Sequence, residues 1–319
     1  MQIIPLKGGS LSSTNHHKDN NFEFVRKTIN LSSSREYGYV RWYSQLKKLQ
    51  RFTTMWPNLV PKVLSVGVEN GNAYFDLEFL QGYTDIKTIF SRDHISDNLI
   101  LKINNSLWQA FNKIHANKLI ANKGATFLYF QEEIFQKILD ARKNEGFNNF
   151  LKHNSYFYNG QKVPNIVNEL HVLEKYFSSI DLEYENFIHG NPTLENTMYS
   201  IDEDKIKFID LYEESIIDSK FLDYSQVLQC SRSFYGFIND REVNINGNSV
   251  FYNQVVPKNY LKFTECFLNN INKKDLTFID ILEASQFIRM LPFKCYAGEI
   301  DKAKYFFVHA CYLFNKIFK

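Results

Sequence analysis

The sequence predicts an α+β protein with two lobes: a small β-rich lobe over residues 1–82 and a larger, mainly helical lobe over residues 83–319. Three observations support this prediction. At 319 residues the chain exceeds the size at which a single hydrophobic core usually divides. Segments rich in β-branched and aromatic residues concentrate before Gly82, and apolar residues at spacings of three and four dominate after it.

The composition is that of an ordinary soluble globular protein, with 44% hydrophobic and 23% charged residues. Its 37 Lys and Arg residues face 35 Asp and Glu residues, which leaves a net charge of only +2. Nucleic-acid-binding domains concentrate far more positive charge than this. We therefore expect no nucleic-acid partner.

The N-terminus gives no sign of export. It lacks a charged region followed by a long apolar stretch, and no run of about 18 apolar residues occurs later. We expect a cytoplasmic protein without a membrane span. The cysteines lack the CxxC spacing of zinc and redox sites, which favours buried free thiols. They are Cys230, Cys266, Cys295 and Cys311.

The elements of the first lobe follow from local patterns. The segment "IIPLKGGSLSST" predicts a strand that runs into a Gly/Ser turn, and "NFEFVRKTINL" predicts further strand-like segments. Residues 32–52 predict a helix, because serines that can cap it precede aromatic residues and leucines at helical spacing. Two strands around an Asn70-Gly71 turn come next. Gly82 is the expected boundary.

The second lobe is predicted to be mainly helical. Its helical apolar periodicity occurs over residues 98–119, 129–144, 163–180, 259–271 and 303–318. Between these segments, "FIHGN" (187–191) and "KIKFIDL" (205–211) each predict a short strand that leads into polar residues. His189, Asn191, Asn196 and Asp210 would then lie on loops at strand ends, where a rigid scaffold commonly holds functional side chains.

Asn196 and Asp210 are candidate metal ligands. An amide carbonyl and a carboxylate are hard oxygen ligands, and Mg²⁺ is usually held by one or two such protein groups together with phosphates and water. The pair is therefore a candidate clamp for a magnesium nucleotide. From spacing alone, the alternative is an asparagine-rich turn followed by an aspartate that caps a helix.

The segment over residues 187–200, "FIHGNPTLENTMYS", resembles the catalytic loop of the aminoglycoside phosphotransferase and choline kinase family. The family pattern is H-G-D, a further Asn, and a strand that ends in an I-D pair which binds metal. The residues that carry this resemblance are His189, Gly190, Asn191, Asn196, Ile209 and Asp210.

Further segments are similar to the same family, so the resemblance extends over nearly the whole chain. "IIDSKFLDYSQVLQ" is similar to the family's G-D-P-x-x-D-L-A stretch, with Asp218 at the expected spacing and Asp223 one residue later than usual. "QAFNKIHANK" resembles the family's helix that ends in Leu-His. "YFDLEFLQG" resembles the hinge between its lobes, where Glu78 and Leu80 would contact the nucleotide.

The resemblance implies a bilobal, protein-kinase-like fold and an enzyme that uses ATP, or another nucleoside triphosphate, with Mg²⁺. Such an enzyme moves the γ-phosphoryl group to a hydroxyl of a small-molecule acceptor. The sequence lacks the D-F-G and A-P-E landmarks of protein kinases, which argues against a protein substrate. By resemblance, we expect the acceptor to be a sugar or sugar derivative of surface polysaccharide biosynthesis. The acidic residues after Asp210 leave a cationic acceptor as an alternative.

Lys27 is the candidate phosphate-binding lysine of the first lobe. In a kinase-like lobe this lysine lies on a strand after a Gly-rich hairpin and pairs with a glutamate on the following helix. Strand alternation places Lys27 on one face with Val25, which would cover a base. Glu36 is the only acidic residue near the predicted helix, so we expect it to orient Lys27. Arg26 is the alternative to Lys27.

The Gly/Ser turn before this strand could lay backbone N–H groups and hydroxyls over phosphates, through Gly9, Ser10 and Ser12. Turns of this composition are common, so the turn alone is a weak signal. His16 and His17 lie beyond it, and we expect both to be exposed loop residues rather than ligands.

Asn191 departs from the family pattern. There the corresponding aspartate accepts or orients the proton of the acceptor hydroxyl, and together with His189 we place Asn191 at the catalytic position. Asparagine can still accept a hydrogen bond, but it cannot take up a proton at neutral pH. The activity of this chain is therefore in doubt.

Three explanations of Asn191 remain open: a deliberate substitution, a natural kinase-like binding protein, and an enzyme that uses another base. The other motif residues are retained, which favours a deliberate substitution. Two alternative functions accordingly stand beside the kinase: a catalytically silent nucleotide-binding pseudokinase, and a nucleotidyl transferase that uses the same clamp with the nucleotide reversed.

Overall fold

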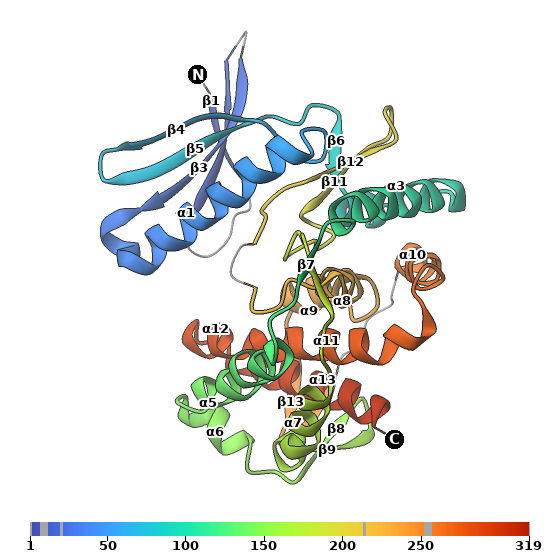
Figure 1. Cartoon of the computed structure of the whole chain (residues 1–319). Coiled ribbons are helices and arrows are strands. Elements are labelled where there is room, and N and C mark those ends of the chain that lie inside the picture. The colour runs from blue at the N-terminus through green and yellow to red at the C-terminus, as the bar shows by residue number, and fades with distance from the viewer. Residues whose placement is uncertain (1, 7–11, 20–21, 213–214, 252–256, 319) are drawn as a thin grey trace. The chain divides into compact units, whose positions relative to one another are not determined.

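A computed structural model gives the chain as a mixed α+β protein, with a small antiparallel sheet at the N-terminus and a mostly helical C-terminal part (Figure 1). This coarse class agrees with the prediction from the sequence. The structure describes residues 2–6, 12–19, 22–212, 215–251 and 257–318, without the side chains of residues 32–37.

The chain divides into two compact units. Unit 1 comprises Met1–Ile114 and His189–Ser215, and unit 2 comprises His115–Ile188 and Ile216–Lys319. Contacts thus group residues 83–114 and 189–215 with the N-terminal sheet, beyond the boundary expected at Gly82. The division by role into a nucleotide-binding and an acceptor lobe stays a prediction.

The sheet of unit 1 has five antiparallel strands in the order β1-β2-β3-β5-β4. They are β1 (Gln2–Leu6), β2 (Ser13–Lys18), β3 (Glu23–Asn30), β4 (Val63–Glu69) and β5 (Asn72–Glu78). Asn70 and Gly71 join β4 to β5 with φ values of 51° and 74°, as a tight hairpin turn requires. This hairpin confirms the prediction from the Asn-Gly pair.

Helix α1 (Leu31–Met55) packs on this sheet, in contact with β3 and β5 (Figure 1). Its buried apolar residues recur at helical spacing, so one face of the helix covers the sheet. The rings of Trp42 and Phe75 lie 6.2 Å apart across this contact. The predicted helix over residues 32–52 is confirmed.

Unit 1 also contains a second, three-stranded sheet of order β12-β11-β6. Its elements and the neighbouring helices are β6 (Tyr83–Asp85), α2 (Ile86–Phe90), α3 (Asp97–His115), β11 (Thr197–Ser200) and β12 (Lys205–Phe208). The hairpin β11–β12 brings the loops before and after it to one end of this sheet.

Unit 2 is built mainly from helices around one apolar core, and α11 packs against both α8 and α13. Its helices are α4 (Ala125–Tyr129), the π-helix η1 (Phe130–Phe135), α5 (Gln136–Ala141), α6 (Glu145–Phe150), the 3₁₀ turn η2 (Ile166–Glu169), α7 (Leu170–Ser179), α8 (Lys220–Ser231), α9 (Tyr235–Asn239), α10 (Lys258–Leu268), the 3₁₀ turn η3 (Lys273–Asp275), α11 (Leu276–Arg289), α12 (Leu291–Tyr296) and α13 (Ile300–Ile317).

Unit 2 has short strands that the helical pattern did not predict. They are β7 (Lys118–Ile120), β8 (Ser155–Tyr158), β9 (Gln161–Pro164), β10 (Tyr184–Asn186), β13 (Asn244–Asn246) and β14 (Ser249–Phe251). They form the pair β10-β7 and the sheet β13-β14-β8-β9. The strand expected over residues 187–191 is therefore wrong, because β10 ends before this segment.

The expectation that His16 and His17 are exposed loop residues is also wrong. Both lie in β2 and are buried, with their rings stacked on Phe79 and Phe24. The sequence of β2, "STNHHK", lacks the apolar residues that mark a strand, and its pairing with β1 and β3 creates the buried environment.

Two expectations about exposure and membranes can be compared with the structure. All four cysteines are free and buried, as predicted. Within the described part of the chain, no helix combines the length and the apolar character needed to cross a membrane.

Candidate functional site

Lys27 and Asp210 form the centre of the site within unit 1. Lys27 lies on the central strand β3, and its ammonium group forms an ion pair with the Asp210 carboxylate. The neighbouring residue, Arg26, makes a two-pronged contact with Asp76 at 2.7 and 2.8 Å and lies over the Tyr74 ring. Consecutive residues of a strand point to opposite faces of the sheet, so Lys27 rather than Arg26 reaches Asp210.

The β11–β12 hairpin places Asn196 beside Asp210. Thr197 pairs with Phe208 in this hairpin, and the backbone N–H of Ile209 donates to the Asn196 carbonyl at 3.0 Å. Asp210 is the next residue and has a φ of 55°. Few residues other than glycine adopt this conformation, which turns the chain sharply at the end of β12.

Hydrogen bonds tie the residues of the loop from His189 to Asn196 together. The Asn196 side chain donates from Nδ2 to the Asn191 carbonyl at 3.1 Å, and the Asn191 N–H donates to His189 Nδ1 at 3.1 Å. The Tyr212 N–H donates to the His189 carbonyl at 3.0 Å. His189 is fully buried, and its ring meets the Phe208 ring edge-on at 5.0 Å. His189 therefore holds the loop in place through its ring contact with Phe208 and the hydrogen bonds that it accepts from Asn191 and Tyr212.

Gly190 occupies a position where a side chain would clash with the backbone. Its φ is 84°, and a Cβ there would lie 2.5 Å from the Tyr212 carbonyl oxygen. Any side chain would both strain the backbone and force these segments apart. The same carbonyl accepts a hydrogen bond from Lys48 of α1, whose side chain is buried.

Gln45 and Lys48 are site residues that the sequence analysis missed. Gln45 donates from Nε2 to Asp210 Oδ1 at 2.7 Å and to the Leu211 carbonyl at 2.9 Å. Both residues come from α1, next to its buried apolar positions Leu46 and Leu49. Their roles depend on where α1 packs against residues 210–212, so the sequence carries no local signal for them.

The environment of Asp210 keeps its carboxylate charged. Burial acts to raise the pKa of this carboxyl, but the Lys27 ammonium and the hydrogen bond from Gln45 outweigh burial, so the pKa lies below its ordinary value. Asp210 is therefore an anion at neutral pH. Its two described partners both contact Oδ1.

Two oxygens of the site remain for a cation. Asp210 Oδ2 and Asn196 Oδ1 accept no hydrogen bond from the described residues. Both are hard ligands, so these residues fit a Mg²⁺ ion that takes its other ligands from phosphates and water. In the described ranges, no group of three or more His, Cys, Asp and Glu residues is arranged to hold a metal by itself.

The other residues predicted to contact the nucleotide, or to orient Lys27, are Gly9, Ser10, Ser12, Glu36, Glu78 and Leu80. Gly9, Ser10 and the Glu36 side chain lie outside the described residues. Ser12 is half-buried immediately before β2. Glu78 ends β5 and accepts from Lys207 Nζ and from the Lys62 N–H, both at 3.2 Å, and Leu80 follows it in the segment that leads to β6.

Glu195, the acidic residue directly before Asn196, contacts a residue of α2. Its carboxylate forms an ion pair with Lys87 of α2 and is 42% exposed. Because Glu195 directly precedes Asn196, its side chain is expected to be exposed and to point away from position 191, and this contact agrees with that expectation. Glu195 is therefore a poor candidate for a substitute base.

Within unit 2, two segments of the family resemblance meet. His115 Nε2 lies 2.9 Å from Asp223 Oδ2, and both side chains are buried. Asn186 joins the same cluster, because its Nδ2 donates to the His115 carbonyl and its N–H donates to the Asp218 carbonyl. His115, Asn186 and the stretch from Asp218 to Asp223 are thus held together within unit 2.

Comparison with known proteins adds no family. No protein-family model matches the chain, and no curated protein matches it significantly. The resemblance to the aminoglycoside phosphotransferase and choline kinase family rests on the motifs of this sequence, and family membership stays a prediction.

Proposed function

We propose that this protein is a kinase-like phosphotransferase, which moves the γ-phosphoryl group of ATP or another nucleoside triphosphate to a hydroxyl of a small molecule. The observation that carries the proposal is the meeting of Lys27, Asp210 and Asn196 at one end of the β11–β12 hairpin. A lysine on a strand, a loop asparagine and a metal-binding aspartate further along the chain are the parts that kinase-type phosphoryl transfer uses.

Each residue of this group has a separate role. Lys27 neutralises charge on the phosphates. Gln45 holds Asp210 Oδ1, which leaves Oδ2 and the Asn196 side-chain oxygen as metal ligands. Mg²⁺ bound there supplies further neutralisation of the phosphate charge as the γ-phosphoryl group moves. A kinase-like, two-lobed fold, with Glu78 and Leu80 at the hinge beside the nucleotide, is part of the proposal.

Position 191 faces the acceptor in this proposal. The Asn191 backbone is fixed on both sides, by the Asn196 side chain and by His189. Its side-chain amide can orient a hydroxyl but cannot accept the proton, so the chain transfers phosphate slowly. The acceptor proposed is a sugar or sugar derivative.

Asn191 also favours a second candidate function, that of a catalytically silent nucleotide-binding protein. Phosphoryl transfer depends mainly on positioning and charge neutralisation, so loss of the carboxylate lowers the rate while leaving the nucleotide site intact. A nucleotidyl transferase would use the same residues with the nucleotide reversed.

Labelled nucleotide separates these functions. Purified protein is incubated with Mg²⁺, a panel of hydroxyl compounds and ATP labelled at either the γ- or the α-phosphate. A kinase gives γ-label on an acceptor, and Asp210→Asn abolishes this transfer. Label from the α-position on an acceptor identifies a nucleotidyl transferase. Nucleotide binding without transfer of either label identifies the silent binding protein and contradicts the proposal.

A further inference from the structure

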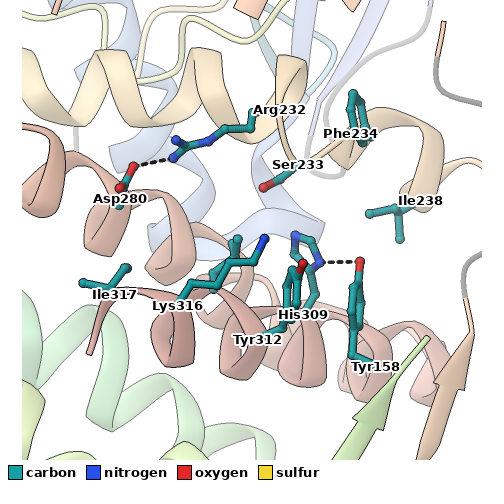
Figure 2. A pocket seen from close by; sticks show the side chains of 11 residues that line it. Tyr158, Arg232, Ser233, Phe234, Ile238, Asp280, His309, Tyr312, Lys316 and Ile317 are labelled. Carbon is teal, nitrogen blue, oxygen red and sulfur yellow. Dashed lines mark hydrogen bonds and ion pairs between the residues drawn. The ribbon is translucent and has the colours of Figure 1, made fainter. Parts of the chain in front are cut away.

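Unit 2 contains a cavity of about 330 Å³ between the C-terminal end of α8, α9, α11 and α13 (Figure 2). Polar residues and aromatic or aliphatic residues line it together. This volume lies at the lower end of the range for small-molecule sites, which also combine apolar walls with a few polar groups.

His309 of α13 supplies a buried polar atom on the cavity wall. The residue is 5% exposed, and its Nδ1 shares a hydrogen bond with the Tyr158 hydroxyl at 2.8 Å. Its second ring nitrogen, Nε2, is buried and has no hydrogen-bond partner among the described residues. Figure 2 shows this nitrogen turned away from Tyr158, on the side of Ser233 and Lys316. A ligand atom there would satisfy a group that is otherwise costly to bury.

Burial and the nearby Lys316 lower the pKa of His309 to about 3. The imidazole is therefore neutral at physiological pH. When the Tyr158 hydroxyl donates to Nδ1, the proton of the ring lies on Nε2, which then donates to a ligand.

Two cationic residues line the cavity, Arg232 and Lys316, and they differ in their contacts. Arg232 lies 2.5 Å from Asp280 and also contacts Glu283, so two acidic side chains engage its guanidinium. Lys316 is exposed at the mouth and lies over the Tyr312 ring, 4.2 Å from the centroid. In the part of the chain that the structure describes, Lys316 forms no ion pair. The Lys316 ammonium can therefore pair with an anionic group of a ligand at the mouth.

Phe234 adds an independent sign of a binding site. It lines the cavity with a φ of 54°, a conformation that costs free energy for a bulky residue and is kept only where the surroundings impose it. Such residues gather at ligand-binding positions. Its ring, with those of Tyr312 and Tyr158, gives the cavity aromatic walls.

We propose that this cavity binds a small organic anion, with a carboxylate or phosphate group attached to an aromatic or aliphatic body. Lys316 contacts the anionic group at the mouth, Nε2 of His309 donates to a polar atom of the ligand, and the body packs against Phe234 and Tyr312. This site is independent of the proposed phosphotransferase function.

Fluorine NMR of the full chain tests the proposal with three probes: 4-fluorobenzoate, 4-fluorophenyl phosphate and the neutral 4-fluorobenzamide. We expect saturable line broadening for at least one of the two anions, and much weaker broadening for the amide. The tighter of the two anions identifies the headgroup. Raising the salt concentration should weaken anion binding, because Lys316 is exposed.

Variants connect this binding to the cavity. Lys316→Gln should weaken anion binding by about fivefold, the effect of one partly exposed charge. Lys304→Gln is the matched control, because Lys304 lies on the same helix, pairs with Asp301 at 2.8 Å and does not line the cavity. His309→Phe should weaken binding further if the variant folds, and the lysine pair decides the question if it does not. Absence of saturable binding of either anion up to about 10 mM, or equal binding to the two lysine variants, would overturn the proposal.

Discussion

Lys27 and Asp210 stand 183 residues apart in the chain and meet in an ion pair within unit 1. Gln45 donates to the same carboxylate oxygen that Lys27 contacts, at 2.7 Å. One aspartate thus receives a cation from β3 and an amide from α1, while its second oxygen faces neither. The proposed function depends on this arrangement, and the predictions below test its parts.

Asp210→Ala should abolish Mg²⁺-dependent stabilisation by nucleotide, because it removes the charged ligand of the proposed clamp. At a nucleotide concentration of about 100 times Kd, the parent protein should gain about 2.7 kcal/mol. Thermal unfolding with and without Mg-ATP measures this gain. Asp202→Asn, an exposed aspartate in the turn between β11 and β12, is the control. Equal stabilisation of Asp210→Ala and the parent would exclude Asp210 as the ligand.

Lys27→Met should raise the pKa of Asp210 from its depressed value. Burial acts to raise this pKa, and Lys27 is the largest influence that lowers it. In the parent, the depressed pKa gives stability that is present above the unfolded value of 3.8 and is lost as the pH falls through the folded pKa. In the variant this dependence of stability on pH should be weaker, because the folded pKa lies closer to the unfolded value. Carboxyl ¹³C NMR titration follows the group, and an unchanged pKa would contradict the ion pair.

Lys27 and Glu36 should act as a unit in transfer. Both Lys27→Ala and Glu36→Ala should lower kcat/KM, and the double variant should lose less than the sum of the two effects in free energy. Steady-state kinetics of the parent, the two single variants and the double variant measures these effects. Full additivity would show that Glu36 does not orient Lys27.

His309 should make unit 2 sensitive to acid. Burial lowers its pKa from 6.5 to about 3, so the unfolded chain binds a proton that the folded chain does not. Stability is therefore complete above pH 6.5 and falls as the pH drops from 6.5 towards 3. Between pH 7.5 and 5.5, the parent should lose about 1.4 kcal/mol more than His309→Gln in denaturant unfolding. The same loss in both proteins would show that His309 titrates normally.

The sequence predicted those parts of the fold that local patterns determine. The Asn70-Gly71 hairpin and α1 follow from turn chemistry and helical periodicity, so both were found. The strand β2 was missed because its residues are polar, and pairing with its neighbours forms it. In unit 2, the pairs β10–β7 and β14–β8 join segments far apart in sequence. The hairpins β8–β9 and β13–β14 are local, and their turns, Asn159-Gly160 and Gly247-Asn248, are signals that the sequence analysis missed.

The residues of the candidate site likewise fall into those that local patterns predict and those that depend on tertiary packing. Lys27, Asn196 and Asp210 were found because each follows from a pattern of its own segment. The parts played by Gln45 and Lys48 depend on where α1 packs against residues 210–212, and no local pattern reports this. The cavity around His309 likewise exists only through the packing of distant helices.

The central claim is that position 191 faces the acceptor of a phosphotransferase, and Asn191→Asp tests it most directly. The new carboxylate restores a general base, so hydrolysis of Mg-ATP and transfer to a hydroxyl acceptor should rise by about 10²-fold or more. Nucleotide affinity should change little, because Lys27 and the metal hold the phosphates. The rates of phosphate release and of acceptor labelling, measured on the parent and the variant at saturating ATP, decide the matter. If Asn191→Asp binds ATP but changes neither rate with any hydroxyl compound of a broad panel, the enzyme account is wrong and the protein is a silent nucleotide binder.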